Sequence, residues 1–354
     1  KMNLCGCVKE QPQTFYHKKE DIVAQKILPG TGGEHYIPYE ERTGEESVVY
    51  FTRDLSPEGL RKIYERVNEK IEGKIGIKLH TGEKNGPNII PHTWVKELVE
   101  KDLSDAAIVE TNTYYEGDRY TTEQHRETLK VNGWTFCPVD ILDENGTTMF
   151  PVKGGKWFTE MSVGKDLADY DSLVVLTHFK GHTMGGFGGS NKNIGIGCAD
   201  GLIGKGMIHT VEGSDNMWSI SMEELMERIA ESTKSVVDHF GEHITFVNVL
   251  RNMSVSCDCE GCAAAPVVTP NIGIVASRDI LAADQASVDL VYALKEDQHK
   301  DLVERMETRH GLRQLSYMKE LHMGNDKYKL IDIDDEDHEI IPKEAVKDVK
   351  PFEG

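Results

Sequence analysis

The chain alternates short apolar runs with amphipathic segments through most of its length. Continuous β-branched and aromatic runs, at residues 48–51 and 173–177, are typical of strands buried within a sheet. In segment 222–240 apolar residues recur every three or four positions, which is typical of a helix with one buried face. Strands and helices alternate at short spacing. This alternation predicts an α/β fold, a layered mixed or mostly parallel sheet flanked by helices.

The elements can be placed by their patterns and start signals. Ser56 followed by Pro57 is typical of a helix start, because serine caps the free amides and proline fits the first turn. We predict strands at 48–51, 74–79, 106–110, 136–142, 173–177, 244–250 and 272–276. We predict helices at 57–67, 92–100, 122–131, 222–240 and 282–294. Segment 181–206 is so dense in glycine that we predict no regular element there.

Three parts are predicted along the chain. Residues 1–46 are rich in Gly, Glu and His and are expected to form an N-terminal arm. Residues 47–330 form the α/β body, either as one unit or with a boundary near residue 150. Residues 331–354 form an acidic C-terminal tail. With 354 residues and 38% hydrophobic side chains, the body can bury a core without a disulfide or metal.

Charge and composition exclude some classes of function. Sixty acidic against forty basic side chains give a net charge of −20, which repels phosphate backbones and predicts no nucleic-acid binding. No apolar run approaches the ~20 residues of a membrane span, so no integral membrane segment is expected. The start of the chain lacks the apolar region of a signal peptide, and we predict a cytoplasmic protein. A Lys ahead of the Met leaves a removed leader open, and protein partners are unknown.

The densest chemical signal follows the strand at 173–177. Seven glycines fall within residues 181–197, and His178, Lys180, His182 and Lys192 lie in or beside this segment. Glycine lets backbone amides approach a ligand closely, and α/β sheets usually bind ligands where strands end. We therefore predict a ligand-binding loop that includes Gly188, Gly189 and Asn193. The alternative is a glycine-rich connection that only packs against neighbouring backbone.

Reactive groups in this loop predict catalysis. A lysine flanked by glycines in an apolar setting can act as a base, an anion clamp or a covalent anchor, and we assign Lys192 as catalytic. We also assign His182 and His178 as catalytic, since imidazoles exchange protons near neutral pH. Lone lysines are more often surface residues, and lone histidines are more often hydrogen-bonded structural residues. A structural role for these residues therefore stays open as the alternative.

The second signal is a cluster of cysteines. Cys257, Cys259 and Cys262 fall within six residues, and thiolates so close together can bind one soft or borderline metal ion or an iron–sulfur cluster. Cys198 is a candidate fourth ligand. The alternative is a turn with three buried or free thiols. The remaining cysteines are treated as incidental: Cys5, Cys7 and Cys137.

Two further loops follow predicted strands. Lys78 comes at the end of the strand at 74–79, and Thr111 and Asn112 follow the strand at 106–110. Hydroxyl, amide and ammonium groups at the ends of strands suit a small anionic ligand, so these residues and Lys180 are predicted to bind it. We predict that the four strand-end loops meet in one crevice.

The order of these motifs resembles the family called domain of unknown function 362 (DUF362), which is associated with iron–sulfur proteins. The resemblance rests on residues 177–195, on the Cys257–Cys259 pair and on residues 272–290, and it spans approximately 48–330. It implies that Asp284 joins the ligand-binding residues. The family's usual cysteine motif matches the Cys257–Cys259 pair. The prediction that Cys262 and Cys198 are metal ligands therefore depends on their spacing alone. Some members carry a ferredoxin-like segment, which is absent here.

A shorter stretch, from the glycine before His182 to Lys192, is similar to a loop of lactate racemase-like proteins. In those proteins a lysine anchors a nickel-pincer cofactor and nearby histidines act as acid and base. Asn191 stands where the likeness implies arginine.

Three hypotheses follow. The first is a metal- or iron–sulfur-binding protein with a crevice for a small anionic ligand. The second is a cofactor-dependent enzyme, similar to a racemase or isomerase, that transfers a proton or hydride with Lys192 and His178 or His182. The third is a scaffold whose thiols are structural.

Overall fold

The computed structural model describes residues 34–214 and 216–353. Most of the predicted N-terminal arm, with Cys5 and Cys7, lies outside the described residues. The described chain opens with a short 3-10 helix, η1 (Tyr39–Glu41), which leads into the first strand of the sheet.

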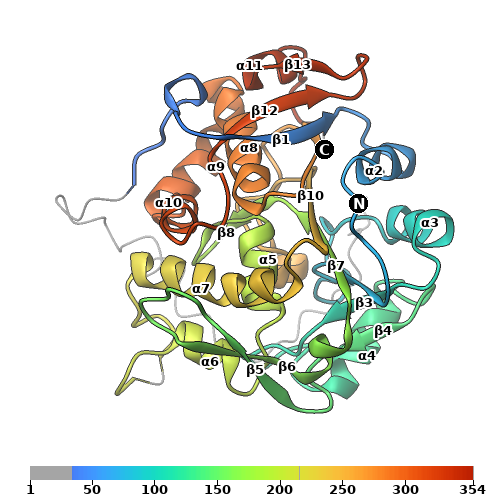
Figure 1. Ribbon diagram of the computed structural model, residues 1–354, viewed down its shortest axis with the longest axis vertical. Helices are drawn as coiled ribbons and strands as arrows, with labels where there is room; N and C mark the ends of the chain where they lie inside the picture. The colour runs from blue at the N-terminus through green and yellow to red at the C-terminus, as the bar shows by residue number, and fades with distance from the viewer. Residues whose placement is uncertain (1–33, 215, 354) are drawn as a thin grey trace, which may run out of the picture.

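One large sheet organises the described part of the chain. Its nine strands lie in the order β13 (His338–Ile340), β12 (Lys327–Asp332), β1 (Glu46–Thr52), β11 (Gly273–Ser277), β10 (Ile244–Leu250), β7 (Ser172–His178), β2 (Ile75–Lys78), β3 (Ala107–Glu110) and β4 (Val139–Ile141). The five strands from β10 to β4 are all parallel, whereas β11 runs antiparallel to both of its neighbours. This mixed, mostly parallel sheet confirms the predicted α/β class (Figure 1).

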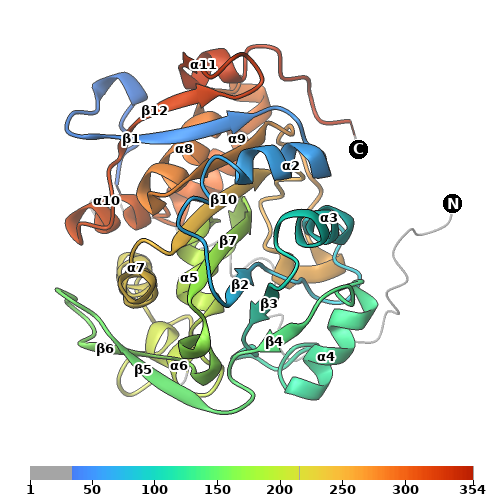
Figure 2. The same cartoon turned by 45° about the vertical axis from the view of Figure 1, so that its right-hand side comes forward.

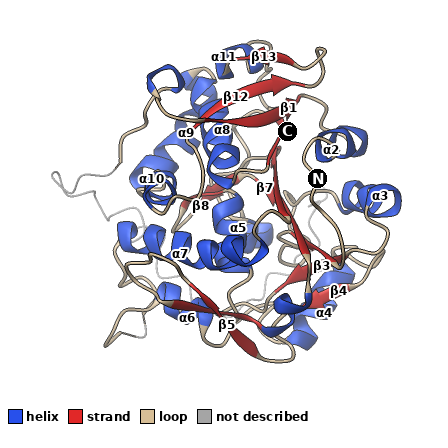
Figure 3. Ribbon diagram, in the orientation of Figure 1, coloured by secondary structure: helices blue, strands red, loops and turns tan. Residues whose placement is uncertain are grey.

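Helices cover both faces of the sheet (Figures 2 and 3). In β7, Leu173 and Val175 join one hydrophobic cluster, while Val174 and Leu176 join the other, because successive side chains point to opposite faces. The helices and 3-10 turns are α2 (Pro57–Tyr64), α3 (His92–Asp102), α4 (Thr122–Val131), η2 (Lys165–Asp169), α5 (Ser190–Gly197), α6 (Gly204–His209), α7 (Met222–Phe240), η3 (Asp258–Ala263), α8 (Ile280–Ala293), α9 (Glu296–Thr308), α10 (Arg313–Glu320) and α11 (Pro342–Ala345).

Local signals set the helix starts that the sequence predicted. Ser56 accepts a hydrogen bond from the Gly59 amide at 3.1 Å, which caps α2. Thr121 forms a capping box with Gln124 at the start of α4, and Asp279 caps α8. The predicted bounds of α4, α7 and β10 agree with the structure.

The expectation of no regular element in segment 181–206 is wrong. This segment contains the hairpin of β8 (Lys180–His182) and β9 (Gly186–Gly188), all of α5 and the start of α6. Glycine disfavours an isolated helix, but α5 forms here because tertiary contacts stabilise it. A Cβ at Gly195 would lie 2.6 Å from the Ile229 carbonyl oxygen of α7, so glycine permits the close packing of α5 on α7.

The C-terminal segment predicted as a tail contributes structure. It completes β12 and supplies β13 and α11, which lie together at one edge of the sheet (Figure 1). A separate hairpin of β5 (Thr147–Pro151) and β6 (Glu160–Gly164) packs against α6 and α7. Among the described residues, no helix combines the length and apolar character needed to cross a bilayer.

Candidate functional site

Two segments far apart in the sequence meet at the carboxyl ends of the parallel strands. Cys257 and Cys259, at the start of η3, come together with His182 from β8, and their ligand atoms all lie within 4.8 Å of one another. Cys257 is 2% exposed, and both cysteines are free thiols. The structure thus brings the cysteine segment and the glycine-rich loop into one cluster, which we call the thiol–imidazole centre.

Glycine makes this meeting possible. Gly181 in β8 donates its amide to the Ser254 carbonyl at 2.8 Å, and a Cβ at Gly181 would lie 2.5 Å from Val255 Cα. Any other residue there would push β8 away from the cysteine segment. The two segments are also joined through side chains, because Thr183 donates a hydrogen bond to Glu260 at 2.7 Å.

The imidazole of His182 has a fixed tautomer. Its Nδ1 accepts the backbone amides of Met184 at 3.1 Å and Gly185 at 2.8 Å, so the proton of the neutral ring is on Nε2. The ring also hydrogen-bonds to Cys257. Burial, together with the nearby Lys192 ammonium, lowers the pKa of His182 to about 4. At neutral pH His182 is therefore a neutral Nε2–H donor beside the sulfurs.

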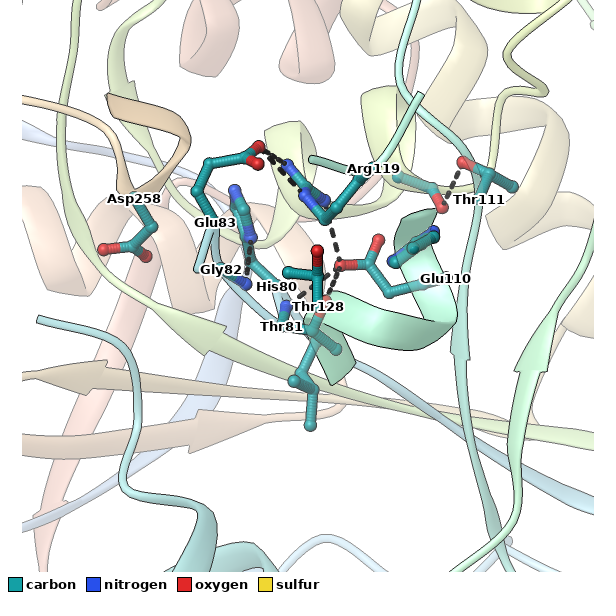
Figure 4. A network of polar contacts seen from close by, with 12 residues as sticks. His80, Thr81, Gly82, Glu83, Glu110, Thr111, Arg119, Thr128 and Asp258 are labelled. Atoms are coloured by element: carbon teal, nitrogen blue, oxygen red, sulfur yellow. Dashed lines mark hydrogen bonds and ion pairs between the residues drawn. The ribbon is translucent and has the colours of Figure 1, made fainter. Parts of the chain in front are cut away.

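His80 has the same arrangement on the other side of Cys257. Its Nδ1 accepts the Gly82 amide at 3.0 Å, and its ring hydrogen-bonds to Cys257. Burial and the Arg119 guanidinium lower the pKa of His80. Figure 4 shows the His80–Gly82 contact beside Arg119 and Glu83. His80 follows β2, two residues after Lys78, and was not among the site residues that the sequence predicted.

The two thiols differ in acidity. The hydrogen bond from Cys259 holds the pKa of Cys257 well below its usual value, and His182 and His80 add to this effect against burial. The same hydrogen bond and burial raise the pKa of Cys259 well above its usual value. Cys257 is therefore the more acidic thiol of the pair.

The three candidate lysines have different surroundings. Lys78 bonds to Glu110 at 3.3 Å and Asn193 at 3.0 Å, and Lys180 pairs with Asp258 at 3.0 Å. Within the described part of the chain, no hydrogen bond or ion pair holds the Lys192 ammonium. Burial lowers the pKa of Lys192, although the two thiols oppose this effect. Among these three lysines, Lys192 is therefore the one whose ammonium has no partner in the part of the chain that the structure describes.

His178 is occupied by structural contacts. Its Nδ1 lies 2.8 Å from an Asp258 carboxylate oxygen, and its Nε2 lies 2.7 Å from the Arg251 carbonyl. Both ring nitrogens face oxygen acceptors, and the ring is 3% exposed. Asp258 is held ionised, because His178 and Lys180 outweigh burial and lower its pKa. These contacts join the end of β7 to the cysteine segment.

The sequence interpretation missed His209, at the end of α6. Its Nδ1 lies 2.9 Å from the Lys205 carbonyl oxygen, which can only accept, so Nδ1 carries the proton and Nε2 is an acceptor. Burial is the main cause that lowers the pKa of His209 to about 4. The nearby Lys192 and His182 contribute to this lowering. The only sequence signal was its place just after the glycine-rich segment.

The predicted loop residues after β3 hold the backbone together. Thr111 donates to the Ala199 carbonyl at 2.9 Å and accepts from Lys205 at 2.6 Å. The Asn112 side-chain amide donates to Thr122 at 3.0 Å, and its Oδ1 lies 3.2 Å from His125 Nδ1. These contacts use the groups that the sequence interpretation assigned to a ligand.

The glycine-rich loop is fastened by Asp284 of α8. Its carboxylate accepts the amides of Ser190 at 2.7 Å and Asn191 at 2.9 Å, at the start of α5. A Cβ at Gly189 would lie 2.5 Å from the same carboxylate. Asn193 donates to Thr177 at 3.0 Å. These two loop amides are therefore taken by Asp284 and are not open to an anion.

Two predicted ligands lie outside the thiol–imidazole centre. Cys198 is fully buried beside Lys78 and Glu110, and burial raises its pKa to about 12. The Cys262 sulfur lies 3.4 Å from the Asn85 carbonyl oxygen. Among the described residues, neither belongs to the group that His182, Cys257 and Cys259 form.

The fold and the site define a class: a layered α/β protein with a buried thiol–imidazole centre at the carboxyl ends of parallel strands. The chain belongs to the family whose description is domain of unknown function (DUF362), because the family model matches residues 75–289, more than half of the chain. This confirms the resemblance in the sequence. None of the curated proteins matches the chain.

Two solved structures are similar to this chain at low identity. One is the lactate racemase apoprotein from Thermoanaerobacterium thermosaccharolyticum, with 15% identity and a TM-score of 0.39, covering 73% of this chain and 59% of that chain. The other is a protein from Thermotoga maritima, with 14% identity and a TM-score of 0.33, covering 55% of this chain and 49% of that chain. This chain thus spans less than two thirds of the length of either protein.

Proposed function

We propose that the protein binds one soft or borderline transition-metal ion at the thiol–imidazole centre and takes a small anionic ligand beside it at Lys192. The single observation that carries this proposal is the buried convergence of Cys257, Cys259 and His182 within 4.8 Å. Thiolate and imidazole are the ligands that Zn²⁺, Ni²⁺ and Cu⁺ prefer in proteins. The lowered pKa of Cys257 favours metal binding, because a cysteine has to lose its proton to bind a metal.

Cys257 and Cys259 are better suited than His182 to be direct metal ligands. A histidine that binds a metal usually donates its other ring N–H to an acceptor. His182 has the opposite arrangement, since its Nδ1 accepts two backbone amides and its proton is on Nε2. We therefore assign Cys257 and Cys259 as the primary ligands and His182 as a donor that supports them. A single ion is favoured over an iron–sulfur cluster, because clusters usually need four protein ligands.

The anionic ligand is assigned to Lys192 by elimination among the lysines. Lys78 and Lys180 already pair with buried carboxylates. The Lys192 side chain runs past Gly185 and Gly188, where a Cβ would lie 3.4 Å and 3.8 Å from its Cδ. The lysine stem thus runs alongside these glycines, and its ammonium can neutralise a carboxylate or phosphate beside the sulfurs.

Metal uptake by the reduced full chain tests the proposal. We expect anaerobically purified protein, dialysed against Zn²⁺, Ni²⁺ or Cu⁺, to bind one ion per chain. Cys257→Ala and Cys259→Ala should each weaken binding by at least about 100-fold, and His182→Gln by about 10-fold, because ligands matter more than their supporting donors. Elemental analysis and competition with a chelator give these values.

Cys137→Ala is the matched control, since Cys137 is a free thiol outside the centre. It should bind metal as the wild type does. Cys198→Ala tests the predicted fourth ligand, and we expect no effect. A reduced wild type that takes up none of the three ions would contradict the proposal, as would unchanged affinity in both Cys257→Ala and Cys259→Ala.

A second candidate is a proton-transferring enzyme, and the opposite tautomers of two histidines favour it. His182 presents an Nε2–H donor, whereas His209 presents an Nε2 acceptor, and the unpaired ammonium of Lys192 lies near both. A donor and an acceptor around one anion-binding group are what a racemase or isomerase needs. The predicted nickel-pincer cofactor belongs to this candidate, and the unpaired amine of Lys192 fits its attachment there.

A further inference from the structure

The thiol–imidazole centre also has the parts of a peroxide-reactive dithiol. Cys257 and Cys259 are both free, and their sulfurs lie within 4.8 Å of each other. One residue separates them, and the chain between them turns into η3, so the sulfurs can approach without any movement of distant elements. A free thiol elsewhere in the described chain, such as Cys198, has no second cysteine in this position.

Hydrogen-bond donors surround the first sulfur. His80 and His182 both hydrogen-bond to Cys257, and each ring is held by backbone amides on its Nδ1, from Gly82 in one case and from Met184 and Gly185 in the other. The donors therefore stay in place without help from a ligand. Such donors stabilise charge on sulfur and on an oxygen that leaves it.

We propose that hydrogen peroxide oxidises this centre, with Cys257 as the sulfur that reacts first, Cys259 as the resolving sulfur, and an intramolecular disulfide as the product. Burial of Cys257, which is 2% exposed, selects a small oxidant over a protein or peptide disulfide. Redox-responsive cysteines typically pair a stabilised thiolate with a resolving cysteine. The inference rests on the proposed function only in that both use the same two sulfurs.

The step balances in atoms and electrons. The Cys257 thiolate attacks one peroxide oxygen, the O–O bond breaks, and Cys257 becomes a sulfenic acid while hydroxide leaves. That hydroxide takes the proton of the Cys259 thiol and becomes water. The Cys259 thiolate then attacks the Cys257 sulfur, the S–O bond breaks, and the second hydroxide takes one proton from solvent. Two sulfurs lose two electrons, and peroxide is reduced to two water molecules.

Formation of the disulfide would switch off metal binding, because both sulfurs would then be bonded to each other. A bound metal would in turn protect the sulfurs from peroxide. The centre would thus have two exclusive states, one reduced and able to bind metal, the other oxidised and closed to it.

Differential alkylation with site-resolved mass spectrometry tests the inference on the metal-free, reduced full chain. After a low dose of peroxide, we expect the wild type to lose two hydrogen atoms by mass and to block Cys257 and Cys259 against alkylation. Cys257 should react roughly tenfold faster than Cys137 in the same molecule, because two imidazole donors and a second thiol lie around the Cys257 sulfur, whereas Cys137 lies outside this cluster. Dithiothreitol should restore both thiols.

Two variants separate the roles of the sulfurs. Cys259→Ser should leave Cys257 as a sulfenic acid that dimedone labels, and Cys257→Ser should show neither label nor loss of mass at the same dose. Cys137→Ser should behave as the wild type. The inference is overturned if the wild type forms no disulfide, or if Cys257 and Cys137 oxidise at equal rates. Metal uptake by reduced protein is measured separately, so either proposal can fail alone.

Discussion

Glu110→Ala is expected to lower the free energy of unfolding by about 3–5 kcal/mol, the cost of breaking a buried ion pair by removing one partner. The Glu110 carboxylate lies 3.3 Å from the Lys78 ammonium and 3.5 Å from the Arg119 guanidinium, and it accepts the Thr81 amide at 2.9 Å. Lys78 is 1% exposed, so it cannot reach water once the carboxylate is gone. Figure 4 shows Glu110 between Thr81 and Arg119. Urea denaturation followed by circular dichroism measures the change.

Glu100→Ala is the matched control, because Glu100 pairs with Lys96 on the exposed side of α3. Its cost should stay below about 1 kcal/mol. Glu110→Gln should fall between the two, since the amide keeps one acceptor for Thr81 but loses the charge. A Glu110→Ala variant as stable as Glu100→Ala would show that the buried pairs contribute nothing to folding.

The Glu110 pair also predicts a pH dependence. Burial alone would raise the pKa of Glu110, but Lys78 and Arg119 outweigh it and hold the pKa well below the usual 4.5. The unfolded chain therefore binds a proton at a pH where the folded chain does not. The stability from this group is complete above the unfolded pKa and is lost as the pH falls toward the folded one. The difference between wild type and Glu110→Gln should be constant above about pH 5.5 and shrink below it.

Asp284→Ala is expected to cost about 3–5 kcal/mol and to weaken ligand binding at Lys192, although Asp284 touches neither Lys192 nor the sulfurs by hydrogen bond. Its carboxylate accepts the amides of Ser190 and Asn191, and the Asn248 side chain at 2.9 Å. Removing it leaves the two backbone amides buried without a partner, at about 1–3 kcal/mol for each, whereas the Asn248 amide still donates to Ser287 at 3.0 Å. Because both backbone amides lie at the start of α5, the helix that carries Lys192 loses its anchor.

Urea denaturation and the binding of inorganic phosphate, measured on the same variant, together distinguish this role from a general loss of stability. Asp297→Ala is the control, since Asp297 is exposed in the first turn of α9, and it should cost less than about 1 kcal/mol. Asp284→Asn should retain part of the stability because one amide oxygen still accepts. A Asp284→Ala variant that unfolds at the wild-type urea concentration would contradict the assignment of Asp284 as the anchor of α5.

Much of the site was visible in the sequence as a set of residues, but their roles were not. Lys192, His182, Cys257 and Cys259 were predicted from glycine density and cysteine spacing, and the structure brings them together. The roles of Lys78 and Asp284 depended on partners more than 30 and 90 residues away, which no local pattern reveals. His209 had only its place just after the glycine-rich segment as a signal, and a lone histidine at a helix end is too common for that to indicate a function.

By itself, the sequence determined the α/β class and the positions of most strands and helices, because these depend on local periodicity and capping. The order of its motifs also carried the resemblance to the family. Only the tertiary structure decided that α5 forms within a glycine-rich segment, since Asp284 and α7 supply what glycine lacks. It also decided which charged groups are paired, and it left the buried Lys192 ammonium without a partner among the described residues. Pairing between distant side chains depends on how the loops pack, and that information is absent from any single stretch of the chain.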